Sequence, residues 1–356
     1  MGRDSRLRHG RVTPVSRPTL ADVARGAGVA VSVASRVLSG DATLQVKAST
    51  RTRVLRTAQA LEYVPQHAGR ALRTSRTDTL ALCIPGVTNP LFEEIRSGVE
   101  SVLDDAGYSL VFADADKLSR GSLAFSRLIG SRRVDGMILQ RSSALSDEEF
   151  EAVIASGMPT VLINSTADNV EVSSIVLPDR EAMRIAVEHL AGLGHHEVGL
   201  LGGPERLDWA ERRSAGFLAA VRSCGVETRP EWQLSGGYTV QSGAEGMRQL
   251  VGLRARPTAI VVENVLAGVG AMSAARRLDV QIPADLSVVA IHDLWLAECM
   301  APALTTVRLP LAELGATSAR LLLAQFRQGA KPEQTCVASP PPHLIVREST
   351  MRRQTR

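Results

Sequence analysis

The stretch TLADVARGAGVAVSVASRVL, residues 19–38, has the pattern of two short helices joined by a tight turn. Thr19 followed three residues later by Asp22 is a helix-start signal, because the hydroxyl and the carboxylate can each accept from orphan amide donors. Apolar residues then recur at the spacing of one helical face, and Gly28 permits the turn. A second helix is expected over residues 31–38, ending before a Ser-Gly pair.

A third helix is expected over about residues 49–61, so that three short helices share one small core. The charge of this region stands apart from that of the rest of the chain. Residues 1–76 carry 14 Lys+Arg against 4 Asp+Glu, a net +10, whereas the remainder carries 27 basic and 33 acidic residues, a net −6. A local positive excess favours polyanions through counterion release. The basic region therefore predicts nucleic-acid contact, with a solvated basic tail as the alternative.

The length of 356 residues and the 44% hydrophobic content are enough for two or three domains. The four cysteines show no CxxC spacing, so we expect a reducing compartment with neither a zinc site nor a disulfide framework. They are Cys83, Cys224, Cys299 and Cys336. No apolar segment follows the N-terminal arginines and no run approaches about 18 apolar residues, which disfavours secretion and membrane insertion.

From Thr79 onward, short β-rich runs alternate with amphipathic stretches of helix length. The runs are TLALCI (79–84), SLVFAD (109–114), GMILQ (136–140), TVLIN (160–164), EVGLL (197–201), TAIVVE (258–263) and SVVAI (287–291). Such alternation predicts parallel sheets with helical crossovers. By itself it allows any doubly wound α/β fold.

A series of short phrases keeps the order and spacing of one known family. They are ADVAR (21–25), GV (28–29), SRVL (35–38), LEYVP (61–65), RALR (70–73), NPLF (89–92), VDGMIL (134–139), HLAGLGH (189–195), AGF (215–217) and PALTTV (302–307). Over about residues 19–348 the chain resembles the lactose/galactose repressor (LacI/GalR) family. The resemblance implies a small all-α helix-turn-helix DNA-binding domain plus an α/β two-lobed periplasmic-binding-protein-like domain.

The same resemblance implies the domain boundaries. They are a basic arm over 1–17, the helix-turn-helix domain over 18–64, a hinge helix and linker over 65–77, an effector-binding and dimerisation domain over 78–348, and a tail over 349–356. Lobe 1 is expected over 78–177 and 308–326, and lobe 2 over 178–307 and 327–348. The chain would then cross between lobes near Pro178, near Val307 and after Phe326. We expect disorder in the arm and the tail, which are polar and contain arginine.

In the family the second helix lies in the major groove, which makes Arg36 the expected guanine reader, since a guanidinium can bond guanine O6 and N7 together. Ser32 is expected to bond a base or a phosphate, and Val31 to touch a thymine methyl. The hinge, residues 66–73, would place Leu72 as a wedge in the minor groove. The full expected DNA-binding set is Thr19, Val31, Ser32, Ser35, Arg36, Thr50, Arg51, Arg70, Leu72 and Arg73, in which Thr50 and Arg51 are phosphate contacts.

Three features depart from the family pattern in this region. Ala30 stands where a serine or threonine usually caps the reading helix, and loss of such a cap costs about 1 kcal/mol. The connection from Ser39 to Gln45 is about two residues longer than usual. Gly69 replaces an alanine of the hinge, at a cost of ~1 kcal/mol in a helix interior. We therefore expect a hinge that depends more heavily on DNA to fold, and the docking angle on DNA stays open.

The family binds its effector between the lobes, at the carboxyl ends of the strands. Positions carried over from the family are Phe92, Trp209, Arg213, Tyr238, Asn264 and Asp293. The polar members suit hydroxyls or an anionic group, and the aromatic members can stack on a sugar ring or a flat base. Val265, Leu207 and His292 depart from the family pattern, so a standard sugar is not implied. His292 suits either pH-sensitive binding or a hydrogen-bonded structural role.

Motifs for catalysis or metal binding are absent from the sequence. GLLGGP (199–204) lacks the spacing of a phosphate loop, there is no GxSxG, and His189, His195 and His196 have no partner at metal-ligand spacing. The adjacent acids Asp104-Asp105 and Glu148-Glu149 are expected on solvated helix surfaces. We therefore expect no enzymatic activity, no cofactor and no metal.

These features together predict a bacterial transcription regulator controlled by a small effector, with repression the commoner outcome in the family. We expect a homodimer, with a tetramer left open, that binds double-stranded operator DNA in the cytoplasm at the nucleoid. One rival is a solute-binding protein of a transporter, which the basic region and the missing signal peptide disfavour. The other is an α/β enzyme, which lacks a nucleophile, an acid/base pair or a cofactor motif. The effector, the operator and the direction of ligand control stay open.

Overall fold

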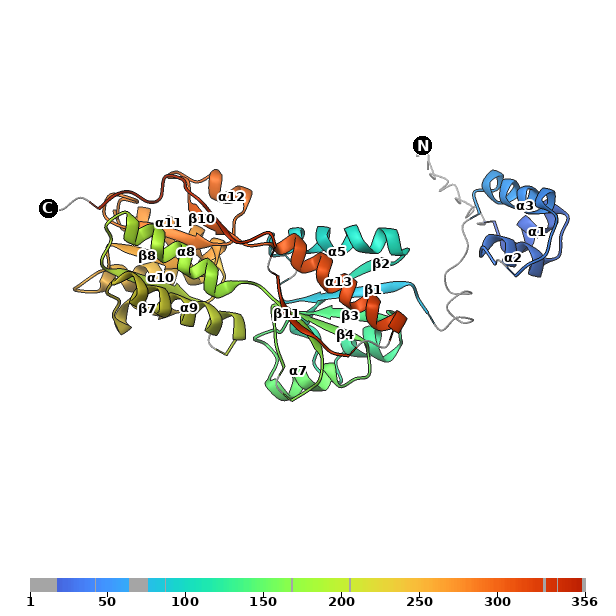
Figure 1. Cartoon of the computed structure of the whole chain (residues 1–356), viewed down its shortest axis with the longest axis horizontal. Coiled ribbons are helices and arrows are strands. Elements are labelled where there is room, and N and C mark those ends of the chain that lie inside the picture. Colours follow the sequence, from blue (N-terminus) through green and yellow to red (C-terminus); the bar gives the residue numbers. More distant parts are fainter. Residues whose placement is uncertain are drawn as a thin grey trace, which may run out of the picture. The chain divides into compact units, whose positions relative to one another are not determined.

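The computed structural model describes residues 18–41, 43–63, 76–86, 88–167, 169–204, 206–328, 331–337 and 339–353. The chain divides into two compact units, one up to residue 75 and one from residue 76 on, which are drawn in Figure 1 and described separately. Several sequence predictions fall outside the described residues. They are the basic arm over 1–17 and the hinge up to residue 75, with Gly69, Arg70, Leu72 and Arg73.

The described part of the small unit has three helices: α1 (Leu20–Ala27), α2 (Val31–Leu38) and α3 (Ala48–Ala60). Thr19 and Asp22 form the expected capping box at the start of α1. Gly28 ends α1 with a φ of 61°, in the left-handed region that glycine adopts without strain. The buried core of this unit is Val23, Ala24, Ala27, Ala34, Val37, Val54 and Ala58. The predicted three-helix unit is confirmed, although α3 begins and ends one residue earlier than expected.

Lobe 1 of the large unit is built on a six-stranded parallel sheet in the order β11-β5-β4-β3-β1-β2. The strands are β1 (Thr79–Ile84), β2 (Ser109–Asp114), β3 (Gly136–Leu139), β4 (Thr160–Ile163), β5 (Ser173–Val176) and β11 (Gln334–Cys336). Leu82 of β1 pairs with Phe112 of β2 on one side and with Ile138 of β3 on the other. β1 therefore lies inside the sheet, between β3 and the edge strand β2.

Alternate residues of β1 enter two different cores, as the twofold side-chain period of a strand requires. Leu80, Leu82 and Ile84 face α5 (Phe92–Ala106) and α13 (Leu311–Gln328), which pack together. Ala81 and Cys83 belong to the opposite core. Its helical elements are η1 (Ala115–Lys117), α6 (Leu123–Phe125), the π-helical turn η2 (Ser126–Gly130) and α7 (Asp147–Ile154).

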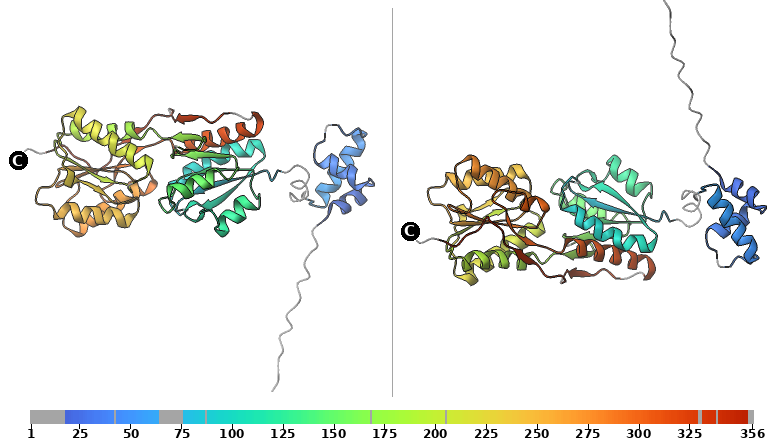
Figure 2. Two further views of the ribbon diagram at one scale, coloured as in Figure 1. Left: turned by 90° about the horizontal axis from the view of Figure 1, so that it is seen from below. Right: turned by 90° about the horizontal axis from the view of Figure 1, so that it is seen from above.

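Lobe 2 has its own six-stranded sheet in the order β12-β10-β9-β8-β6-β7, parallel except that β12 runs antiparallel to β10. The strands are β6 (Val198–Gly202), β7 (Gln233–Ser235), β8 (Ala259–Val262), β9 (Ser287–Ile291), β10 (Thr305–Arg308) and β12 (His343–Ile345). The helices are α8 (Asp179–Gly192), α9 (Asp208–Cys224), η3 (Pro230–Trp232), α10 (Val240–Gly252), α11 (Val265–Arg277) and α12 (Trp295–Glu298). Figure 2 shows helices on both faces of each sheet, so the predicted two-lobed α/β fold is confirmed.

The chain crosses between the lobes three times. The first crossing lies between β5 and α8, at Leu177 and Pro178, and the second lies between β10 and α13, at Leu309 and Pro310. Our placement of the third crossing after Phe326, with residues 327–348 in lobe 2, was wrong. The segment that follows α13 stays in lobe 1, where β11 pairs with β5 and covers what would otherwise be an open sheet edge. The crossing occurs only between β11 and β12.

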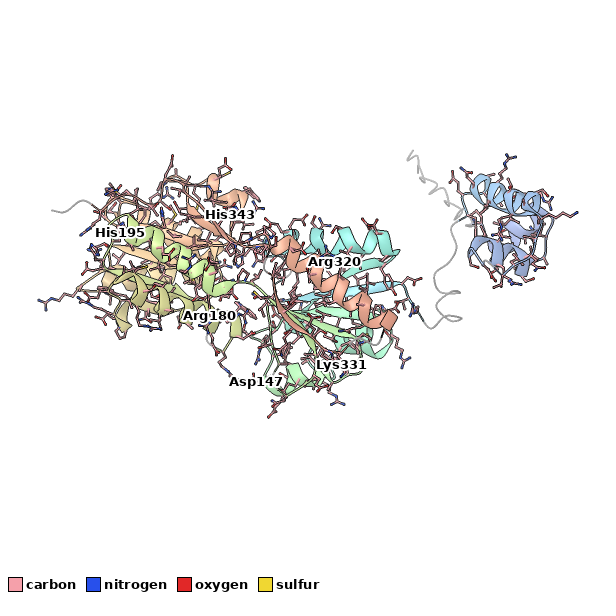
Figure 3. All side chains as sticks on the ribbon, in the orientation of Figure 1. Asp147, Arg180, His195, Arg320, Lys331 and His343 are labelled. Carbon is pink, nitrogen blue, oxygen red and sulfur yellow. The ribbon has the colours of Figure 1, made fainter. Side chains whose placement is uncertain are left out.

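The assignment of residues 349–356 to a disordered tail was also wrong for its described part. Ser349 is fully buried, and its hydroxyl donates to the Val288 carbonyl across 2.6 Å and accepts from the Thr305 amide across 2.8 Å. The Met351 carbonyl accepts from His195 Nε2 at 3.1 Å, at the end of lobe 2 away from lobe 1 (Figure 3). The segment up to Arg353 is therefore part of lobe 2, because it satisfies polar groups at the amino ends of β9 and β10.

Candidate functional sites

The exposed side of α2 carries the four side chains expected to read DNA. Val31 and Ser32 are exposed, and Ser35 and Arg36 are half-buried. Their spacing of i, i+1, i+4 and i+5 puts them on one side of the helix, while the other side is buried in the small core. The structure thus brings these predicted residues together on an accessible surface.

Arg36 is engaged by the connection that follows α2. Its Nε donates to Asp41 Oδ2 across 2.7 Å, and its Nη2 donates to Thr43 Oγ1 across 3.0 Å. Hydrogen bonds from Thr43 and Arg36 hold the pKa of the Asp41 carboxyl well below its usual range. Asp41 and Thr43 were absent from the predicted site. The only sign of their role in the sequence was that the connection from Ser39 to Gln45 is longer than is usual in the family.

The other expected DNA contacts of the small unit lie near helix starts. Ala30 and Lys47, the residues before α2 and α3, make no side-chain cap, as expected for Ala30. Thr50 and Arg51 are half-buried in the first turn of α3. The Thr19 hydroxyl is used inside the small unit, where it donates to Asp22 Oδ2 across 2.7 Å. A phosphate contact by Thr50 and Arg51 remains a prediction.

A cleft of about 680 Å³ lies between the two lobes. Five of the six residues predicted to bind an effector line it: Phe92 from lobe 1, and Trp209, Arg213, Tyr238 and Asn264 from lobe 2. The prediction missed further polar residues on the lobe 1 side, which are Asp116, Gln140, Arg141 and Asn164. Gln140 and Asn164 directly follow β3 and β4, so the position of polar residues after buried runs was an available signal.

Asp293 does not line the cleft, and its predicted role there was wrong. Its Oδ1 accepts from Thr306 Oγ1 at 2.6 Å and from Arg347 Nη1 at 2.8 Å, so the carboxylate ties the end of β9 to β10 and to the segment after β12. The residue that lines the cleft after β9 is His292. The chain turns at His292, which has a φ of 69°, and this turn directs the imidazole to the cleft and the Asp293 carboxylate away from it.

Arg213 is the centre of a buried polar network at the lobe 2 side of the cleft. Its Nε donates to Asp179 Oδ1 across 2.8 Å, and its Nη1 donates to the Glu263 carbonyl across 2.6 Å. Its Nη2 lies 2.8 Å from His292 Nε2, and the guanidinium also stacks over the Tyr238 ring at 5.8 Å. Since a guanidinium can only donate, His292 Nε2 is the acceptor and the ring proton is on Nδ1.

His292 is therefore neutral. Burial, assisted by the positive charge of Arg213, holds the pKa of its imidazole well below the usual value. Among the described residues, no side-chain or backbone group pairs with its buried Nδ1. Buried polar groups are nearly always hydrogen-bonded, so this donor is the exception in the network.

Glu263 supports Tyr238 from behind the cleft. It is fully buried, and its carboxylate accepts from the Gly203 amide at 3.0 Å, from Ser214 Oγ at 3.1 Å and from the Tyr238 hydroxyl at 3.3 Å. Burial raises the pKa of Glu263 to about 7, against the opposing effect of Arg213. This carboxyl thus titrates near neutral pH although it makes no contact with the cleft.

Asn264 and Trp209 complete the lobe 2 wall. The Asn264 side-chain oxygen accepts from the Leu266 amide at 2.8 Å and caps α11, which leaves its amide nitrogen as the group that can donate into the cleft. Trp209 packs with Leu207, Ala210 and Tyr238 in a small apolar cluster. The wall therefore combines flat apolar surfaces with hydrogen-bond donors.

Known proteins resemble the chain along most of its length. Residues 19–66 match the family described as "Bacterial regulatory proteins, lacI family", and residues 187–350 match the "Periplasmic binding protein-like domain". The HTH-type transcriptional repressor CytR of Escherichia coli strain K12 is 30% identical over 309 residues, which is 87% of this chain and 90% of the relative. The chain belongs to the LacI family.

Solved structures agree with this membership. The Lac repressor dimer bound to operator and the anti-inducer ONPF is 28% identical, with a TM-score of 0.78 over 94% of this chain and 100% of that one. A LacI family transcriptional regulator from Mycobacterium smegmatis is 34% identical, with a TM-score of 0.71 over 77% of this chain and 99% of that one. The protein is thus a DNA-binding transcriptional regulator, and the solute-binding rival is set aside.

In this LacI-family protein, polar contacts join the two lobes beside the cleft. Arg212 of α9 donates to Asn164 Oδ1 across 2.8 Å, and it also contacts Asp179 and Asp208 of its own lobe. A second contact between the lobes is made by Arg308, whose Nη2 donates to Glu94 Oε1 across 2.9 Å. A change in the relation between the lobes must therefore change these contacts.

Two further properties concern the described part of the chain only. Within it, no three or more His, Cys, Asp and Glu side chains gather in a way that could hold a metal ion. His195 instead bonds Thr258 and the Met351 carbonyl through its two ring nitrogens. A search of the described helices finds none with the length and apolar character needed to cross a bilayer.

Proposed function

We propose that this protein is a homodimeric repressor that binds a pseudo-palindromic operator in the cytoplasm and is controlled by a small neutral ligand in the cleft. Arg36 reads a guanine, Ser32 and Val31 contact neighbouring bases, and Ser35, Thr50 and Arg51 contact the DNA around them. Thr19, Arg70, Leu72 and Arg73 complete the DNA contacts, as the family resemblance implies. The exposed side of α2 supports this assignment, since its reading residues are accessible together.

The chemistry of the cleft supports a neutral ring-shaped ligand with several oxygen acceptors, such as a sugar or a nucleoside. The charged cleft residues already have partners in the protein, because Arg213 pairs with Asp179, Arg141 pairs with Asp147 and Asp116 bonds Ser142. The Asn264 amide and His292 Nδ1 are among the groups that can donate to a ligand. A related regulator, CelR, has been solved in complex with cellobiose at 28% identity to this chain.

Dimerisation is supported by the apolar edge of lobe 1. Val111 and Phe112 on β2, the outermost strand of the sheet, are 37% and 44% exposed, and Leu123 of α6 is 72% exposed. Exposed apolar residues grouped at a sheet edge favour association with a second copy. A dimer would present two copies of α2 to the two half-sites of one operator.

The test combines selection of DNA with a ligand screen on the full chain. Selection from a randomised duplex pool is expected to yield a two-half-site consensus, and Arg36→Ala is expected to weaken binding to it far more than binding to unrelated DNA. A thermal-shift panel of neutral sugars and nucleosides, with their phosphates as charged controls, is expected to give the largest shifts with neutral members. A selected pool without a consensus would reject the operator-binding proposal. Thermal shifts given only by the phosphates would reject the neutral ligand.

A further inference from the structure

We propose that Asp41 and Thr43, in the long connection after α2, hold the Arg36 guanidinium in the orientation that reads guanine. They would act as positioning residues for base readout, without base contacts of their own. This inference rests on the proposed reading role of Arg36.

The connection folds back onto the end of α2. Gly40 has a φ of 70°, in the left-handed region, and this turn lets the Asp41 amide donate to the Arg36 carbonyl across 3.1 Å. The Ser39 hydroxyl bonds the same carbonyl at 3.2 Å. The carboxylate of Asp41 is thereby placed beside the Arg36 side chain. A connection without these residues would have no acceptor at this point.

The three side chains form a closed ring of hydrogen bonds. Asp41 Oδ2 accepts from Arg36 Nε at 2.7 Å, while Asp41 Oδ1 accepts from the Thr43 amide at 2.8 Å and from the Thr43 hydroxyl at 2.7 Å. The Thr43 hydroxyl oxygen in turn accepts from Arg36 Nη2 at 3.0 Å. Every donor in this ring has an acceptor, so the arrangement fixes the rotation of the guanidinium plane as well as its position.

The ring occupies one edge of the guanidinium and leaves the other. A guanidinium has five N–H groups in a rigid fork, and the Nε–H and one Nη2–H form the side edge that Asp41 and Thr43 bind. The end edge, formed by Nη1 and the second Nη2–H, has no acceptor among the described residues. Two parallel donors on that edge match guanine O6 and N7. The Arg36 side chain is 42% exposed, so that edge can reach a partner.

A masking role for Asp41 would require that it compete with DNA for the same edge of Arg36. The contacts favour positioning, because the side edge is the one that a guanine does not need. An arginine held at one edge also loses less rotamer entropy when it binds a base, and each long side chain carries up to about 2 kcal/mol of it. Positioning therefore increases discrimination between bases as well as affinity.

The experiment uses the full chain and the consensus duplex selected as above. Each guanine of the duplex is replaced in turn by 7-deazaguanine, which lacks the N7 acceptor, and the loss of binding affinity is measured. The guanine that Arg36 reads is the one whose replacement weakens binding by the parent protein but not by Arg36→Ala. Asp41→Ala is expected to reduce discrimination at that same base by about tenfold, within the range for one bidentate pair. Thr43→Val, which removes only the hydroxyl, is expected to give a smaller loss in the same direction.

Two controls separate positioning from other effects. Glu62→Gln removes one negative charge from the small unit at an exposed site and is expected to leave discrimination unchanged. In an Arg36→Ala background, Asp41→Ala is expected to cause no further loss of discrimination.

Tighter operator binding by Asp41→Ala with intact discrimination would show masking and overturn the proposal. An equal loss of discrimination from Asp41→Ala in the Arg36→Ala background would also overturn it. If Arg36→Ala changes the effect of no guanine replacement, the proposed reading role of Arg36 is rejected, which is a separate outcome. Circular dichroism melting of each variant checks the fold.

Discussion

The Nη2 of Arg213 and the Nε2 of His292 lie 2.8 Å apart, and this one hydrogen bond determines the chemistry of the cleft wall. Because the guanidinium can only donate, the imidazole must accept at Nε2 and keep its proton on Nδ1. Arg213 is in turn fixed by Asp179 and the Glu263 carbonyl. The network thus converts a titratable side chain into a neutral donor of fixed tautomer.

We expect His292 to remain the neutral Nδ1–H tautomer at pH 8 and at pH values well below the ordinary histidine pKa of 6.5. Its folded-state pKa is lowered, so the folded protein resists a proton that an unfolded histidine takes up near its ordinary pKa of 6.5. Nitrogen-15 NMR of labelled histidine can assign the ring from His292→Gln and follow both nitrogens with pH. A midpoint near 6.5, or a proton on Nε2, would contradict the hydrogen-bond assignment. His196, which is exposed, serves as an internal reference for an accessible ring.

Glu263→Gln is expected to become relatively more stable as the pH rises. The Glu263 pKa is about 7 in the folded protein against an ordinary value of 4.5, so the unfolded chain loses this proton first. The free energy of unfolding of the parent therefore falls between pH 4.5 and 7, by about 3 kcal/mol in total. The Gln variant lacks this loss, while the contributions of other groups are shared by both proteins.

Urea unfolding of both proteins at pH 5 and pH 8 measures the difference. It should shift in favour of Gln by about 2.5 kcal/mol over that range, because part of the loss has already occurred at pH 5. Glu211→Gln, at an exposed site on α9, is the matched control and should show little pH dependence. A difference between Glu263→Gln and the parent that stays constant with pH would mean that Glu263 is ionised throughout.

The sequence predicted the fold where its signals are regular. The small unit follows from the capping box at Thr19 and from helical spacing, and the buried strands follow from their apolar runs. The strands β5, β7, β10, β11 and β12 were not predicted. They are only three or four residues long, and segments such as QTC (334–336) are polar, so their pairing is set by the sheet that they join. The burial of Ser349 was equally invisible, because its partners lie at least 44 residues away in sequence.

Five cleft residues could be predicted because family positions carry over along the elements that hold them. Asp293 could not be distinguished from His292 in this way, since their roles depend on a backbone turn in which His292 has a φ of 69°. The same limit applies to Arg36: its position on α2 followed from the helix pattern, but its bonds to Asp41 and Thr43 depend on the path of the connection.

Asp293→Ala and His292→Phe are expected to have opposite effects. Asp293 and Arg347 form a largely buried pair at 2.8 Å, and removing one partner of such a pair costs about 3–5 kcal/mol. Asp293→Ala should therefore lower the melting temperature but keep the thermal shift given by a ligand found in the screen. His292→Phe should abolish that shift with a smaller loss of stability. If Asp293→Ala removes the ligand shift at equal ligand saturation, the correction of its role is itself wrong.

Arg212→Ala is expected to weaken the coupling between ligand and DNA. Arg212 joins the lobes through Asn164 and also holds Asp179, which fixes Arg213 in the cleft wall. A ligand that changes the relation between the lobes changes this contact. Loss of the contact should therefore reduce the coupling free energy between ligand binding and DNA binding. We expect the ratio of operator affinities with and without ligand to fall about fivefold, a reduction of about 1 kcal/mol in coupling.

Operator titrations at zero and saturating ligand measure that ratio. Arg222→Ala removes an exposed arginine from the same helix and should leave the ratio unchanged. If Arg212→Ala lowers ligand affinity while the ratio at saturation is unchanged, Arg212 supports binding only and the lobe contact does not carry the coupling.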